Sequence, residues 1–157
     1  MVKLKNNSSA AYRMSRGQDQ GELDAANIVK SISDKNGNLT ETIKIITHSM
    51  GAAYAKGYVN ALIEYFKKNN ISTDFLEFEA DFAPYQPTKQ KANSEVKTYQ
   101  FSHSKDLVAG KDKIEGAEYM DTSDDKKQDH GINTFMDQIK NLPEGNYKIV
   151  NGQIVPM

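Results

Sequence analysis

Two hydrophobic periods alternate along this chain and divide it into predicted helices and predicted strands. Apolar residues recur at helical spacing in residues 22–33, 50–68 and 132–142. In the first of these segments, Leu23, Ala26, Val29 and Ile32 recur every three residues, which is typical of one face of an amphipathic helix. Turn-forming residues follow each segment, so we expect three separate helices.

The strand period appears between these helical segments. Short apolar or alternating runs predict strands at residues 10–14, from about Thr42 to Thr47, and at 73–79, 95–101 and 114–120. Residues 15–21 and 80–94 are predicted loops. In the tail, Asn151-Gly152 inside residues 147–155 predicts a two-residue hairpin. Residues 1–9 are polar, and we expect them to be loosely ordered.

This order of elements predicts an α/β fold. Strands separated by helices pair in parallel through right-handed crossovers. We therefore expect a three-layer sandwich, with a mostly parallel sheet of about four to five strands and helices on both faces. With 157 residues and no internal linker, residues 1–157 are predicted to form a single domain. Functional residues of such a sheet lie beyond the carboxyl ends of its strands.

Composition narrows the classes of function. The net charge of −1 and the scattered basic residues argue against nucleic acid or an anionic membrane as the partner. The absence of cysteine excludes disulfides, thiolate metal sites and a cysteine nucleophile. The three histidines lack metal-ligand spacing, so neither a metal nor a cofactor is expected. No apolar stretch reaches the roughly 20 residues of a transmembrane helix, and no signal peptide is recognised. The compartment cannot be inferred.

The segment from the second predicted strand into the second helix has the pattern of a nucleophile elbow. A serine at a tight strand–turn–helix junction adopts a strained backbone, so small residues must surround it. Ser49 stands at this junction, with Gly51 two residues after it and Thr47 two residues before it. A Ser-x-Gly turn also occurs in α/β proteins without catalysis, so the pentapeptide alone leaves both interpretations open.

A serine nucleophile needs a base and an acid that orients the base. Asp106 follows the strand predicted at 95–101, and His130 comes before the last predicted helix. The chain order Ser49, Asp106, His130 is the order of α/β-hydrolases. Asp81 is an alternative acid, because it follows the strand next to the elbow. His48 is expected to line the pocket or to pack, and His103 lies too close to Asp106 in sequence to be oriented by it.

These three segments resemble the α/β-hydrolase superfamily in its lipase and esterase branch. The resemblance rests on Ile-Ile-Thr-His-Ser-Met-Gly-Ala at 45–52, Ser-Lys-Asp-Leu-Val at 104–108 and His-Gly-Ile-Asn-Thr-Phe at 130–135. It implies Ser49 as nucleophile, Asp106 as acid and His130 as base, with the Met50 N–H as one oxyanion donor. Residues 7–17 also resemble hydrolase-like segments that follow the repeats of bacterial Rhs-type proteins, so the chain could be a short or truncated relative of them.

The resemblance specifies neither the residue that supplies the second oxyanion N–H donor nor the type of hydrolase activity. The 48 residues before Ser49 offer only the loop 15–21 for that donor, with Gly17 or Gln18 as candidates. We expect a serine hydrolase of small-molecule or lipid esters; lipase, esterase, thioesterase and amidase activity all remain open. The alternative is a catalytically weak or inactive interaction or effector module of a larger assembly. Because a short sheet leaves open strand edges, a homodimer or an upstream partner domain is expected.

Overall fold

The core of the protein is a four-stranded parallel sheet. The computed structural model describes residues 9–122, 130–139, 147–150 and 153–156. The strands β1 (Ile43–His48), β2 (Leu76–Phe82), β3 (Thr98–Ser102) and β4 (Glu118–Asp121) lie in the order in which they occur in the chain. The expected parallel α/β arrangement is confirmed. All four carboxyl ends therefore meet at one edge of the sheet.

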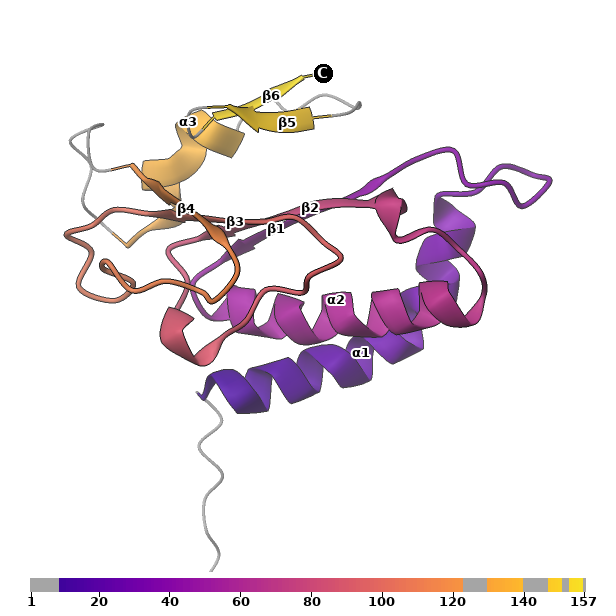
Figure 1. Ribbon diagram of the computed structural model, residues 1–157, viewed down its shortest axis with the longest axis horizontal. Helices are drawn as coiled ribbons and strands as arrows, with labels where there is room; N and C mark the ends of the chain where they lie inside the picture. The colour runs from indigo at the N-terminus through magenta and orange to yellow at the C-terminus, as the bar shows by residue number, and fades with distance from the viewer. Residues whose placement is uncertain (1–8, 123–129, 140–146, 151–152, 157) are drawn as a thin grey trace, which may run out of the picture.

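Helices cover both faces of this sheet (Figure 1). The helix α2 (Met50–Lys68) lies along one face. On the other face lie the 3-10 helix η4 (Ile132–Phe135), the short helix α3 (Met136–Ile139) and the antiparallel hairpin of β5 (Tyr147–Val150) and β6 (Gln153–Pro156). The predicted hairpin is confirmed, while its Asn151-Gly152 turn and the last residues of the predicted helix 132–142 lie outside the described residues.

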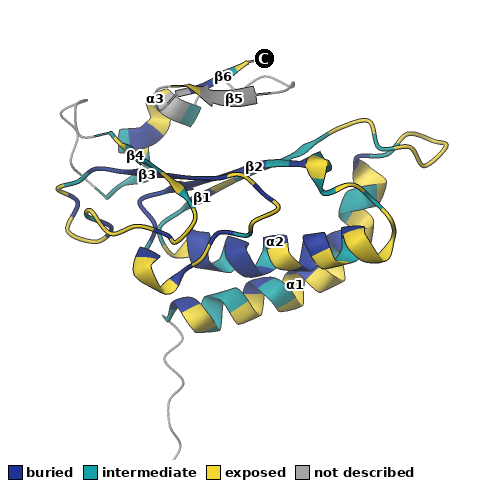
Figure 2. Ribbon diagram, viewed as in Figure 1, coloured by how far each residue is buried: buried dark blue, intermediate teal, exposed yellow. Residues whose placement is uncertain are grey.

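Aromatic rings pack on the β5–β6 side of the sheet, and aliphatic and aromatic side chains pack together on the α2 side. Phe82 stacks on Phe101 with ring centroids 4.6 Å apart, and Phe135 meets Phe82 edge-on at 5.4 Å. Across the sheet, Leu62 and Phe66 of α2 pack with Leu76 of β2. Figure 2 shows this burial along the central strands and along the side of α2 that faces them. The central strands β2 and β3 are therefore buried on both faces, while β1 and β4 are partly exposed.

The N-terminal segment differs most from its prediction. The strand at 10–14 and the loop at 15–21 are wrong, because one helix, α1 (Ala10–Ser31), runs through both. The Ser9 hydroxyl caps this helix by accepting a hydrogen bond from the Tyr12 N–H at 3.2 Å. The helix packs on the outer side of α2 and forms a further layer (Figure 1). Only its continuation through residues 22–31 was predicted.

Glycines inside α1 serve close packing of the two helices. A Cβ on Gly17 would overlap the Tyr54 carbonyl of α2, and a Cβ on Gly21 would lie 2.7 Å from the Ala61 Cβ. Gly57 of α2 faces the Met14 carbonyl of α1 in the same way. Without side chains at these positions, the two main chains come close together. These glycines therefore belong to a helix interface and not to a turn.

We expect Gly17→Ala to destabilise the protein by about 3 kcal/mol, because the added methyl group forces α1 away from α2. Chemical denaturation measures the change in the free energy of unfolding. Gln20→Ala, on an exposed position of the same helix, serves as the control and should be tolerated. Equal stability of Gly17→Ala and the wild type would contradict the close packing described here.

The other strands are shifted by a few residues from their predictions. β2 continues through Ala80, Asp81 and Phe82, which were assigned to a loop, because their side chains are buried between the flanking layers. The two prolines at 84 and 87 favour a loop in this segment, but the strand ends only just before them. β3 and β4 start three and four residues later than predicted.

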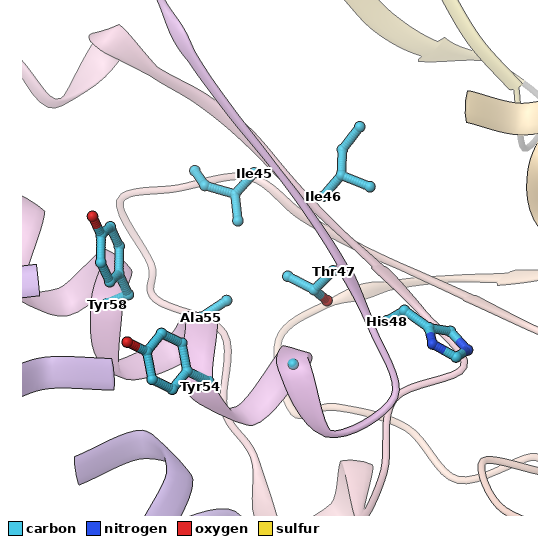
Figure 3. A pocket seen from close by; sticks show the side chains of 8 residues that line it. Ile45, Ile46, Thr47, His48, Tyr54, Ala55 and Tyr58 are labelled. Carbon is cyan, nitrogen blue, oxygen red and sulfur yellow. The ribbon is translucent and has the colours of Figure 1, made fainter. Parts of the chain in front are cut away.

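The outer edge of β1 has no partner strand among the described residues. A pocket of about 380 Å³, widely open to the surface, lies between this edge and α2 (Figure 3), lined by Ile45, Ile46, Thr47, His48, Gly51, Tyr54, Ala55 and Tyr58. Open strand edges are usually covered, and the homodimer or upstream domain expected here stays a prediction. In the described part of the chain, no helix has the length and apolar character needed to cross a bilayer.

Candidate active site

The turn between β1 and α2 holds Ser49 in a strained conformation. Ser49 has φ 54° and ψ −121°, which non-glycine residues rarely adopt. Two main-chain hydrogen bonds join it to the segment at and after the end of β2: its N–H donates to the Phe82 carbonyl at 3.0 Å, and its carbonyl accepts from the Tyr85 N–H at 3.1 Å. The end of β2 therefore holds the serine in the geometry of a nucleophile elbow.

A continuous hydrogen-bond chain joins Ser49, His130 and Asp106. The His130 Nε2 lies 2.7 Å from the Ser49 Oγ, and the His130 Nδ1 lies 2.8 Å from the Asp106 Oδ2. Ser49 follows β1, Asp106 follows β3 and His130 follows β4, so parallel pairing brings all three to the same edge of the sheet. The three residues selected from the sequence are therefore joined, with His130 between Ser49 and Asp106.

The structure also separates the two candidate acids. The Asp106 side chain is 1% exposed and accepts a second hydrogen bond, from the Val108 N–H at 2.7 Å. His130, at 24% exposure, remains open to solvent on one side. Asp81 lies elsewhere, because its carboxylate accepts hydrogen bonds from Thr47 and Lys56 on the α2 side of the sheet. Of the two acids, Asp106 is the one within hydrogen-bond distance of His130.

Asp81 belongs to a buried charged cluster beneath the elbow. The Lys56 ammonium of α2 donates to the Asp81 carboxylate and, at 2.8 Å, to the Glu79 Oε1. The Thr47 hydroxyl donates to the Asp81 Oδ1 at 2.6 Å. Lys56, Glu79 and Asp81 are at most 3% exposed, and the Glu79 Oε2 has no hydrogen-bond partner among the described residues. The cluster ties the first half of α2 to β1 and β2 just before Ser49.

Burial governs the charges in this cluster. Desolvation, reinforced by the negative charge of Asp81, raises the pKa of Glu79 to about 8. For Lys56, burial by itself lowers the pKa, but the attraction of Asp81 and Glu79 outweighs it and the net pKa is raised. A neutral Glu79 beside the Lys56–Asp81 pair leaves no uncompensated charge in the core near neutral pH.

The raised pKa of Glu79 predicts that stability falls as pH rises from about 4.5 to about 8. Over this range the folded protein retains a proton that the unfolded chain has released, so folding weakens by at most about 1.4 kcal/mol per pH unit. Glu79→Gln, which cannot ionise, should remove this decline. Urea denaturation of both proteins at several pH values measures the difference, and parallel pH profiles would contradict the prediction.

Of the predicted oxyanion donors, Met50 lies next to Ser49, and Gly17 and Gln18 do not. Met50 is the first residue of α2, directly after Ser49, where helical N–H groups have no intrahelical acceptor. The positive end of the helix dipole also favours a developing negative charge there. The loop assignment of Gly17 and Gln18 is wrong. Gly17 packs against the α2 main chain, and the Gln18 amide donates to Glu64, so neither is placed as an oxyanion donor.

The remaining two histidines have structural contacts. His103 is fully buried; its ring nitrogens lie 3.0 Å from the Thr134 Oγ1 and 2.9 Å from the Thr122 Oγ1, and its ring stacks on Phe135. His48 lines the pocket beside β1, and its Nε2 lies 2.7 Å from the His130 main-chain oxygen. Among the described residues, no three His, Asp or Glu side chains are grouped closely enough to hold a metal ion.

Sequence reasoning missed the Lys56 cluster and the contact from His48 to His130. A lone lysine in the small, apolar first half of α2 was a signal for the first, since buried lysines pair with acids. No local pattern indicates the second. Comparison with known proteins gives no further assignment: no protein-family model, curated protein or solved structure matches this chain.

Proposed function

We propose that this protein is a serine hydrolase of carboxylic esters, in which Ser49 is the nucleophile. The observation that supports this most is the hydrogen-bond chain from the Ser49 Oγ through His130 to Asp106. A serine hydroxyl attacks a carbonyl only when a base removes its proton, and the base works best when a buried carboxylate orients it. The strained elbow and the adjacent helix N-terminus are further support.

The proposed reaction proceeds through an acyl-enzyme. The Ser49 Oγ bonds to the ester carbonyl carbon while its proton passes to the His130 Nε2. The carbonyl oxygen becomes an oxyanion next to the Met50 N–H. Collapse of this intermediate breaks the bond to the alcohol oxygen, which takes the proton from His130. A water molecule then repeats these steps, with His130 as its base, and releases the acid and free Ser49.

Turnover of p-nitrophenyl esters of increasing acyl length tests the proposal and narrows the substrate class. Wild-type protein should release p-nitrophenol, and Ser49→Ala, folded to the same extent by circular dichroism, should not. The acyl length at which kcat/KM is highest separates small-ester from lipid-ester substrates. Equal rates for the wild type and Ser49→Ala would contradict the assignment of Ser49.

The second candidate is a catalytically weak or inactive interaction or effector module. Two observations favour it. Gly17 and Gln18, the candidates for the second oxyanion donor, lie inside α1, and the outer edge of β1 is open among the described residues. Losing one oxyanion donor lowers kcat by about 10²–10³. A folded wild type without turnover on any ester of the series would favour this candidate. Light scattering of that protein would show whether it forms the expected dimer.

A further inference from the structure

His48 connects the strand of the nucleophile to the main chain of the base. It is the last residue of β1 and directly precedes Ser49. Its Nε2 lies 2.7 Å from the main-chain oxygen of His130, and the two imidazole rings lie 5.2 Å apart at an angle of 44°. A carbonyl oxygen can only accept a hydrogen bond, so the proton of this bond is on the His48 Nε2.

This contact acts on a different part of His130 from the catalytic hydrogen bonds. Ser49 and Asp106 hold the imidazole of His130, whereas His48 holds its main chain. The described contacts of His130 thus fix both ends of the residue, one through Asp106 after β3 and one through His48 on β1. The His48 Nε2 faces a carbonyl, so in this arrangement it is not the base for Ser49.

We propose that His48 is a positioning residue that keeps the His130 imidazole within hydrogen-bond reach of Ser49 through its bond to the His130 carbonyl. The role rests on the proposed hydrolase function. A proton must pass between the Ser49 Oγ and the His130 Nε2, and transfer of this kind is sensitive to displacements of about 1 Å. The hydrogen bond from His48 to the His130 carbonyl joins the base to the residue next to the nucleophile, so His130 and Ser49 move together.

The test compares three substitutions that differ in the hydrogen bond they retain. His48→Phe keeps a ring but has no N–H, and His48→Ala removes the ring. His48→Gln retains an N–H donor the same number of bonds from Cβ as the imidazole Nε2. We expect kcat for a p-nitrophenyl ester to fall about 30-fold in His48→Phe and His48→Ala with little change in KM. His48→Gln should stay within about fivefold of the wild type, because the donor is restored.

A matched control separates positioning from general damage to the strand. Ile46 lies two residues earlier, on the same face of β1, and is 42% exposed. Ile46→Ala should leave kcat within about twofold of the wild type. The comparison is made with Ile46→Ala and His48→Phe at the same thermal midpoint of unfolding. Rescue by glutamine is a readout that a merely structural role would not produce, since Gln and Phe both fill part of the imidazole volume.

The outcomes distinguish this role from the proposed function. An active wild type with an equally active His48→Phe overturns the role of His48 and leaves the hydrolase intact. A His48→Gln as slow as His48→Phe overturns it as well, because the donor would then not be the cause. A wild type without ester turnover overturns the hydrolase and this role together. Nitrogen-15 NMR of the imidazoles adds a test: a His48 protonated only on Nδ1 would contradict the bond to His130.

Discussion

Replacing Asp106 with asparagine is expected to lower kcat for ester hydrolysis by about 10³ to 10⁴ while the protein stays folded. The Asp106 Oδ2 accepts the hydrogen bond of the His130 Nδ1, which directs the Nε2 lone pair at the Ser49 hydroxyl. An asparagine amide can donate to Nδ1 instead, which holds His130 in the tautomer that cannot take the serine proton. Steady-state kinetics on the ester that the wild type turns over fastest measures the loss.

Asp81→Asn is the matched control for this prediction. Asp81 is also a buried acid near the end of a central strand, but its carboxylate accepts hydrogen bonds from Thr47 and Lys56. Its replacement leaves the contact between Asp106 and His130 in place, so the loss of kcat in the folded fraction should be smaller than in Asp106→Asn. A larger loss in Asp81→Asn would contradict the assignment of Asp106 as the orienting acid.

Replacing Lys56 with methionine is expected to destabilise the protein by about 3–5 kcal/mol. The substitution removes the cation of the buried cluster, so Asp81 loses its ion pair and the neutral Glu79 loses a hydrogen bond, in a site without access to water. Breaking a buried ion pair from one side leaves an uncompensated charge, which is more harmful than having no pair. Denaturant titration at neutral pH measures the difference in the free energy of unfolding.

Two further variants locate the origin of this effect. Lys67 forms an ion pair with Glu95 at the surface, where the two side chains are 57% and 34% exposed. Lys67→Met should therefore change stability by less than about 1 kcal/mol. Adding Asp81→Asn to Lys56→Met removes the remaining charge and should recover part of the lost stability. Equal losses in Lys56→Met and Lys67→Met would contradict the importance of burial.

The arrangement of Ser49, Asp106 and His130 could be predicted because it depends on local patterns and one rule of topology. Each residue follows a strand that the alternation of apolar residues identifies, and parallel strands bring their carboxyl ends together. The choice between Asp106 and Asp81 could not be made in this way, since both follow strands predicted from the sequence, and Asp81 proves to lie inside β2. It depended on Lys56, which lies 25 residues before Asp81 in the chain and meets it only in the folded protein.

The N-terminal helix shows where local patterns fail. Gly17 and Gly21 favour a turn when read alone, and they were assigned to a loop. Their role becomes visible only against Gly57, 40 residues after Gly17, where the absence of side chains on both helices allows close contact. The same error placed the second oxyanion donor at Gly17 or Gln18. A feature formed by two segments distant in the sequence cannot be inferred from either segment alone.

Labelling with a fluorophosphonate probe tests the central claim most directly. The probe forms a covalent bond only with a serine that a base activates. We expect one adduct per wild-type molecule by intact mass, located at Ser49 by peptide mapping. Ser49→Ala should form no adduct, and Asp106→Asn should be labelled much more slowly. A folded wild type that remains unlabelled, or a label on another residue, would contradict Ser49 as an activated nucleophile.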